Sequence, residues 1–121
     1  MRALVLLAFV ASPAWADSPV IEKVQGRQSG TTWQFDVTLS HADTGWDDYA
    51  DGWRVLNTDG TELGMRVLHH PHVNEQPFTR SLSGVTIPEG ASEIVIQSRD
   101  SVGGWSDQTV TISLDEPNYA R

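Results

Sequence analysis

The sequence contains no cysteine, and this absence removes several classes of protein from consideration. An exported domain without cysteine gains no stability from disulfides, and it has no thiolate for catalysis or for a cysteine-based zinc site. With no cysteine to carry a lipid, we also expect no lipoprotein anchor. The stability of the fold must therefore come from the apolar core and from hydrogen bonds between strands.

Basic residues are scarce. The chain has 8 Lys and Arg against 16 Asp and Glu, which gives a formal net charge of −8. Nucleic-acid binding depends on a basic patch that neutralises phosphates, so we expect no nucleic-acid partner. An anionic membrane surface is disfavoured for the same reason. The acidic balance is typical of a soluble exported protein, or of one that meets cations.

Long apolar runs are also lacking, except near the start. Residues 1–16, MRALVLLAFVASPAWA, combine a positive Arg2, an apolar run over 3–10 and a small-x-small end at 14–16. This order predicts a secretory signal cleaved after Ala16; the alternative is a buried N-terminal strand or helix. The run is too short to span a bilayer. We therefore expect one mature domain from Asp17, periplasmic or secreted, with no membrane insertion after signal removal.

No stretch of the mature chain repeats apolar residues at the helical period, whereas strand patterns recur between turn residues. The clearest is TTWQFDVTL, in which apolar and polar residues alternate. Short alternating strands at close spacing predict an all-β fold, a seven-stranded antiparallel Greek-key β-sandwich over 17–114. The tail 115–121 carries no pattern, so we expect it to be frayed. The expected strands are 21–28, 31–39, 53–56, 61–69, 78–85, 92–99 and 108–114.

The last third of the chain, IPEGASEIVIQSRDSVGGWSDQTVTISL, resembles the end of a fibronectin type III or related immunoglobulin-like domain. A turn leads into an alternating strand, a Gly-rich loop and a final strand. The tyrosine usual in that family at the start of the sixth strand is missing, because Glu93 and Ile94 stand there. The chain as a whole is similar to small exported bacterial proteins of unknown role. The resemblance implies an immunoglobulin-like fold and no particular activity.

Antiparallel strand counting predicts that three loops, 41–52, 69–77 and 100–107, meet at one end of the sandwich. All four histidines fall in these loops, whereas the opposite end has ordinary turns. The loops also carry acidic residues, namely Asp43, Asp47, Asp48, Asp51, Glu75, Asp100 and Asp107, and three aromatic residues, namely Trp46, Tyr49 and Trp105.

A transition-metal site is the first hypothesis for this end. Pro71 favours an extended His70, and positions i and i+2 of an extended chain share a face, so His70 and His72 could bind one ion. His41 is the expected third ligand, with His69 an additional candidate. Imidazole suits copper or zinc. Asp43, Asp47, Asp48, Asp51, Glu75 and Asp100 are candidates for a fourth ligand or for orienting the histidines; the alternative is a polar loop.

Three other hypotheses concern the same loops. Asp43, Asp47, Asp48 and Asp51 could bind calcium, although their spacing does not follow the EF-hand pattern and such residues are common in turns. The rings of Trp46, Tyr49 and Trp105 could anchor a protein partner or stack on sugars, or they could cap the core. No Ser, His or carboxylate spacing indicates catalysis, so we expect a binding module rather than an enzyme.

Overall fold

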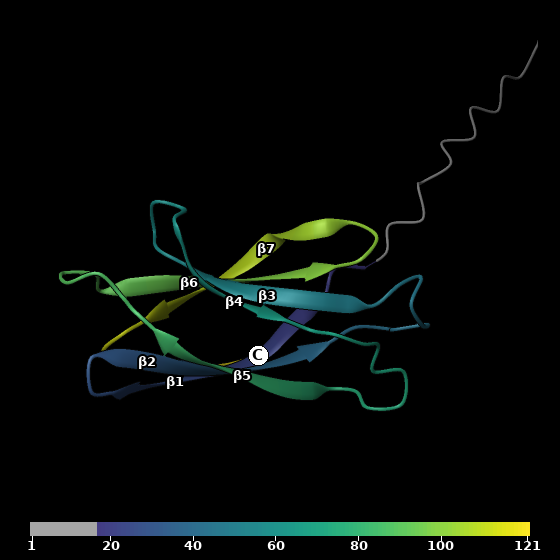
Figure 1. Ribbon diagram of the computed structural model, residues 1–121, viewed down its shortest axis with the longest axis horizontal. Helices are drawn as coiled ribbons and strands as arrows, with labels where there is room; N and C mark the ends of the chain where they lie inside the picture. Colours follow the sequence, from purple (N-terminus) through teal and green to yellow (C-terminus); the bar gives the residue numbers. More distant parts are fainter. Residues whose placement is uncertain (1–16) are drawn as a thin grey trace, which may run out of the picture.

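The computed structural model describes residues 17–121, so the expected signal, residues 1–16, lies outside the described part. This part folds into two antiparallel four-stranded sheets packed face to face as a β-sandwich (Figure 1). The strand order is β5-β2-β1-β8 in one sheet and β4-β3-β6-β7 in the other. The strands are β1 (Val20–Ser29), β2 (Thr32–Ser40), β3 (Ala50–Leu56), β4 (Glu62–Val67), β5 (Phe78–Val85), β6 (Glu93–Asp100), β7 (Gly104–Ser113) and β8 (Asn118–Ala120). No membrane-spanning helix occurs between Asp17 and Arg121.

The core lies between the two sheets, and the alternation of the sequence explains which residues fill it. On β2, Phe35, Val37 and Leu39 are buried, because every second side chain of a strand points to the same face. Trp33 continues this row and stacks on Phe35 with a centroid separation of 6.0 Å. The expectation of one inward face on this strand is confirmed.

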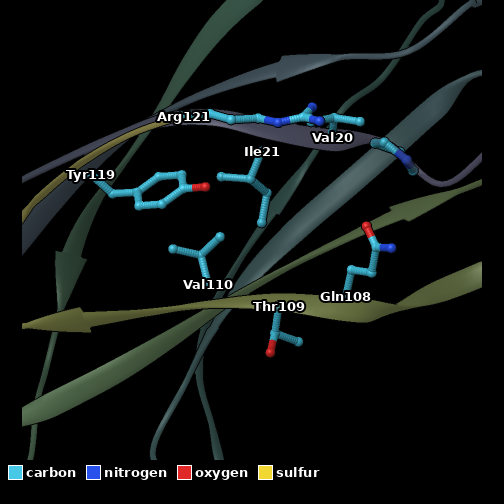
Figure 2. Close-up of a pocket in the computed structure, with 8 residues that line it drawn as sticks. Val20, Ile21, Gln108, Thr109, Val110, Tyr119 and Arg121 are labelled. Atoms are coloured by element: carbon cyan, nitrogen blue, oxygen red, sulfur yellow. The ribbon is translucent and has the colours of Figure 1, made fainter.

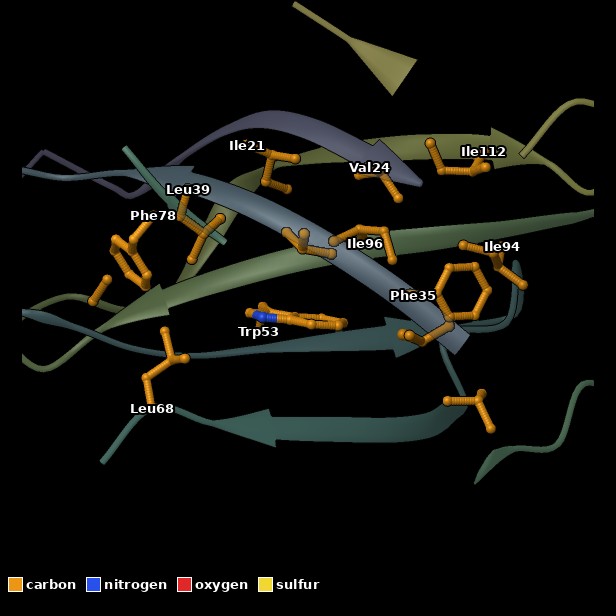
Figure 3. Packing of buried hydrophobic residues seen from close by; sticks show 14 residues of the cluster. Ile21, Val24, Phe35, Leu39, Trp53, Leu68, Phe78, Ile94, Ile96 and Ile112 are labelled. Carbon is orange, nitrogen blue, oxygen red and sulfur yellow. The ribbon is translucent and has the colours of Figure 1, made fainter. Parts of the chain in front are cut away.

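The second sheet contributes the largest core residue. Trp53 of β3 is fully buried and lies among the side chains that both sheets turn inward (Figure 3). Ile94 and Ile96 of β6 and Ile112 of β7 are buried in the same cluster and come from the same sheet as Trp53. Burying side chains of this size is worth about 1.5–3 kcal/mol each. The core therefore supplies the stability that disulfides do not.

The strand count differs from the expectation, because the tail is not frayed. Asn118–Ala120 form an eighth strand, which pairs with Lys23, Val24 and Gln25 of β1. The backbone amide of Gly26 donates to the carbonyl of Pro117 at 2.7 Å. Gly26 has no side chain to obstruct this approach. Three residues are too few to show an alternation pattern, so this strand could not be predicted from the residues 118–120 alone.

Two strands also begin earlier than expected. β3 starts at Ala50 rather than at 53, and β7 starts at Gly104 rather than at 108. Both early segments contain register shifts, where β3 and β7 pair irregularly with β6. A bulge interrupts the two-residue period, so these segments resembled loops. Trp105 and Asp107, expected in a loop, therefore lie on β7.

The ends of the sandwich differ as strand counting predicts. The loops 41–49, 68–77 and 101–103 lie together at one end (Figure 1), and hydrogen bonds connect them. The opposite end carries the connections 30–31, 57–61, 86–92 and 114–117. One of them is the expected Asp-Gly turn, in which Gly60 has a φ of 91° and donates to Asn57 at 2.9 Å. We call the first end the loop pole.

Candidate binding site at the loop pole

The buried carboxylate of Asp43 joins two of the three loops. One oxygen accepts a hydrogen bond from the ring of His41 at 2.6 Å and another from the amide of Ala50 at 2.9 Å. The other oxygen accepts from the amide of His72 at 2.8 Å. Hydrogen bonds to an ionised group are the strong ones, and this carboxylate has no side-chain exposure. Asp43 therefore fixes the loop 41–49 against the loop 68–77.

The ring of His41 lies between two carboxylates. Its Nδ1 forms the hydrogen bond to Asp43, and its Nε2 is 3.6 Å from Oδ1 of Asp48. That oxygen of Asp48 is buried and has no hydrogen-bond partner among the described residues. The bond to Asp43 sets the tautomer of the neutral ring, because Nδ1 must carry a proton to donate to a carboxylate. The lone pair of Nε2 then points away from Asp43.

His72 is buried in a different environment from His41. Its ring stacks on Phe78 with a centroid separation of 4.0 Å, and its Nε2 is 2.9 Å from a guanidinium nitrogen of Arg80. Arginine can only donate, so Nε2 accepts and Nδ1 carries the proton. Burial, and after it the charge of Arg80, lowers the pKa of His72, which favours the neutral form of the ring.

The structure does not assemble the expected ligand set of His41, His70 and His72. Within residues 17–121, no three His, Asp or Glu side chains are placed so that they could hold one metal ion together. The rings of His70 and His72 do lie close, with a centroid separation of 5.0 Å. However, Arg80 occupies Nε2 of His72, and the other nitrogen carries the proton. His72 has no free lone pair for a metal unless Arg80 moves away. His69 and His70 are exposed on the same loop.

The acidic candidates are dispersed rather than gathered around one ion. Asp51 lies on β3 and pairs with Arg99 at 2.9 Å, and Glu75 pairs with Arg80 at 3.2 Å. Asp100 is buried and accepts from the amides of Val102 and Gly103 at 2.8 and 2.6 Å, so it stabilises the β6–β7 turn. Asp47 is exposed at the tip of the loop 41–49. A calcium site formed by Asp43, Asp47, Asp48 and Asp51 is therefore not preassembled.

The aromatic candidates fall into two environments. Trp46 is 68% exposed and sits at the tip of a turn that Gly45 and Asp48 close. Tyr49 contacts Trp46 edge-on, at a centroid separation of 5.6 Å. Edge-to-face pairs of this kind are favourable, so the exposed ring has a fixed support. Val102, on the turn 101–103 of the same pole, is also an exposed apolar residue.

Trp105 does not belong to this exposed group. The guanidinium of Arg54 lies over its ring at 3.8 Å from the centroid, and that of Arg99 lies 5.1 Å away. These side chains come from three neighbouring strands of the β4-β3-β6-β7 sheet. Stacked cations of this kind are attracted by the ring. They cover a surface that a sugar would otherwise contact, so Trp105 is a packing residue on the outer face of this sheet.

A shallow cavity of about 340 Å³ opens at the pole, where the start of the described chain meets the first loop. Asp17, His41 and Gln76 are among the residues that line it. The side chain of Gln76 joins the two loops, because it accepts from the amide of His41 and donates to the carbonyl of His72, both at 3.0 Å. His41, which is hydrogen-bonded to Asp43, and Gln76, which is hydrogen-bonded to His41, therefore both line this cavity.

Sequence reasoning missed Gln76 and Arg80. Arg80 lies on β5, eight residues after His72, and no spacing rule connects an arginine of a strand with a histidine of the loop before it. Gln76 is one of many polar loop residues. Buried polar groups need hydrogen-bond partners. This rule alone predicts that buried histidines of the loop have polar neighbours, but it does not say which residues these are.

No family model matches the chain, and no solved structure matches it. The chain is similar to a protein of Halomicrobium mukohataei described as a "Putative lipoprotein", with 34% identity over 99 residues. The match covers 82% of this chain but spans only 48% of the relative. The chain thus corresponds to about half of the relative's length.

Proposed function

We propose that this chain is an exported, non-enzymatic binding module that recognises a protein partner through the loop pole. The observation that carries the proposal is the exposure of Trp46 on a turn held by hydrogen bonds. An aromatic side chain in a fixed position binds at low entropic cost, and tryptophan is enriched among the residues that dominate interface energetics. The export part is supported by the signal pattern of residues 1–16 and by the description of the relative.

The charge of the pole indicates what kind of surface would fit. The loops 41–49, 68–77 and 101–103 contain no Lys or Arg, whereas Asp47 and Asp48 directly follow Trp46. A partner with a cationic rim around an apolar pocket would complement this surface, because opposite potentials steer association. Added salt should then slow association, since mobile ions screen exposed charges.

Site-specific photocrosslinking tests this proposal. A benzophenone amino acid at position 46, in the chain exported by its own cells, should give one discrete adduct. The same group at position 58, in the β3–β4 turn at the opposite end, is the matched control. Adducts of equal yield from both positions, or none from position 46, would contradict the proposal.

A second candidate function is binding of a transition metal, at a ligand pair that differs from the expected one. His41 Nε2 and Asp48 Oδ1 are 3.6 Å apart, and Asp43 orients His41 as a carboxylate commonly orients a metal-binding histidine. The remaining positions would be filled by water. Zinc titration followed by calorimetry should give binding that Asp48→Asn removes and His70→Gln preserves. Absence of saturable binding, or loss only with His70→Gln, would refute this candidate.

We further propose that the sandwich is of the fibronectin type III or immunoglobulin-like kind. The strand orders β5-β2-β1 and β4-β3-β6-β7 support this, because consecutive strands are divided between the sheets as in Greek-key sandwiches. Strand β8 would then be an addition at the edge of the first sheet. An experimental structure with a different strand order would contradict this assignment.

A further inference from the structure

The four edge strands of the sandwich are protected to different degrees. β8 has three residues, and β4 has six with Arg66 on its inward face, opposite Trp53. β5 carries Arg80 and a glycine, Gly84, with a φ of 72°. Short length, inward charge and irregular backbone are the devices by which proteins keep edges from pairing. These three edges are therefore poor templates for another strand.

β7 lacks these devices over its second half. Its irregular pairing with β6 ends at Thr109, and from there Thr109–Ser113 pair regularly with Gln97–Glu93. The regular segment, TVTIS, has no charge, no proline and no glycine, and its residues favour strands. No strand among residues 17–121 pairs with the other edge of β7. An exposed edge of this kind is a template for a further strand.

A cavity of about 200 Å³ lies beside this edge, where the two sheets separate (Figure 2). Ile21, Val110 and Tyr119 turn toward one another there. Gln108 and Thr109 complete the β7 side of the cavity. A strand added to β7 would therefore find space for an inward-facing side chain, which is how strand addition combines backbone hydrogen bonds with side-chain pockets.

The sequence of the segment fits a second copy of itself. In an antiparallel pair centred on Val110, the two Val110 side chains meet on the inner face, and Thr109 lies opposite Thr111 of the other copy. Thr–Thr pairs across strands are favourable. Asp107 lies opposite Ser113 of the other copy, so no carboxylates face each other across the pair. We propose that two copies of this chain associate through β7, which joins their β4-β3-β6-β7 sheets into one.

The test measures the oligomeric state of residues 17–121 by sedimentation velocity over a range of concentrations. We expect a reversible dimer that salt strengthens, because screening reduces the repulsion between two acidic chains. The variant Thr109→Lys with Thr111→Lys should be monomeric, since each lysine would face a lysine of the other copy. Both threonines are exposed, so the core is not altered.

The matched control is Gln28→Lys with Ser83→Lys, which makes the same charge change at exposed positions of the other sheet. This control should dimerise at least as well as the original chain, because it lowers the net negative charge. Amide hydrogen exchange should slow on Thr109–Ser113 as the dimer forms. A chain that stays monomeric throughout, or a dimer unaffected by the β7 lysines, would overturn the proposal. Neither result bears on crosslinking at Trp46, which tests the loop pole alone.

Discussion

The carboxylate of Asp43 accepts hydrogen bonds from the ring of His41 at 2.6 Å and, through its other oxygen, from a backbone amide 29 residues further along the chain. Both oxygens are used, and neither is accessible to water. This buried carboxylate is therefore one of the main supports of the contact between the loops 41–49 and 68–77.

Asp43→Asn should destabilise the protein strongly. The amide keeps one acceptor but turns a donor toward groups that are themselves donors, so at least one buried hydrogen bond is lost. Leaving buried polar groups unsatisfied costs about 1–3 kcal/mol. Urea unfolding at neutral pH measures the loss. Asp47→Asn, exposed on the same loop, should change stability by no more than about 0.5 kcal/mol. Equal effects of the two substitutions would show that Asp43 is not the support.

His72 should make stability depend on pH. Its pKa is lowered in the folded protein by burial and by Arg80, so the unfolded chain takes up the proton first as the pH falls. The unfolded chain then binds more protons than the folded protein does. The free energy of unfolding must therefore decrease as the pH falls below about 6.5, the ordinary pKa of histidine. Above that value this contribution to the pH dependence vanishes.

Guanidinium-induced unfolding between pH 5 and pH 8 measures this dependence. His72→Gln should flatten the decrease on the acid side of about pH 6.5, whatever its effect on stability at pH 8. His69→Gln, at an exposed position of the same loop, is the control and should keep the slope of the original chain. An unchanged slope in His72→Gln would mean that other groups cause the acid sensitivity.

The tryptophans should differ in their accessibility to a quencher. Trp46 is 68% exposed, whereas Trp53 is fully buried. Trp46→Phe should therefore remove most of the emission that acrylamide quenches readily, and it should leave stability within about 0.5 kcal/mol of the original. The ring of Trp105 is covered by two arginines. Trp105→Phe should therefore remove emission that acrylamide quenches less than that of Trp46. Quenching that persists unchanged in Trp46→Phe would place this ring against the protein rather than in solvent.

Much of this fold follows from the sequence, and the exceptions have physical causes. Alternation identified β2 and its inward residues, because a strand with one buried face must alternate. Antiparallel counting then placed the histidine loops at one end. Bulges concealed the start of β7, and β8 is too short to show a pattern. The partners of His72 could not be predicted. Arg80 lies on a strand and His72 on a loop, and the spacing of two residues in the sequence does not show that their side chains will point toward each other.

The stack of Arg54 on Trp105 should contribute measurably to stability. The guanidinium carbon lies 3.8 Å from the ring centroid, close enough for a cation–π interaction of about 0.5–1 kcal/mol at a partly exposed site. A double-mutant cycle with Arg54→Met and Trp105→Leu isolates this coupling from the bonds of Arg54 to Gln97 and Glu62. A matched cycle with Arg80→Met and Trp105→Leu joins residues of different sheets and should give a coupling near zero. Equal couplings would remove the cation–π explanation.

Gly26→Ala should loosen the strand that the sequence did not predict. A methyl group at this position would lie 2.9 Å from Cε1 of Phe35 and 3.0 Å from Cβ of Pro117. Phe35 is fixed in the core, so the chain around Pro117 must move, and overpacking of this kind costs about 1–3 kcal/mol. Hydrogen exchange should quicken along β8. Gly103→Ala, where a methyl would meet nothing closer than 3.5 Å, should leave both stability and exchange unchanged. If the amides of β8 remain protected from exchange in Gly26→Ala, the side chain of Phe35 moves to accommodate the methyl group and the chain around Pro117 does not.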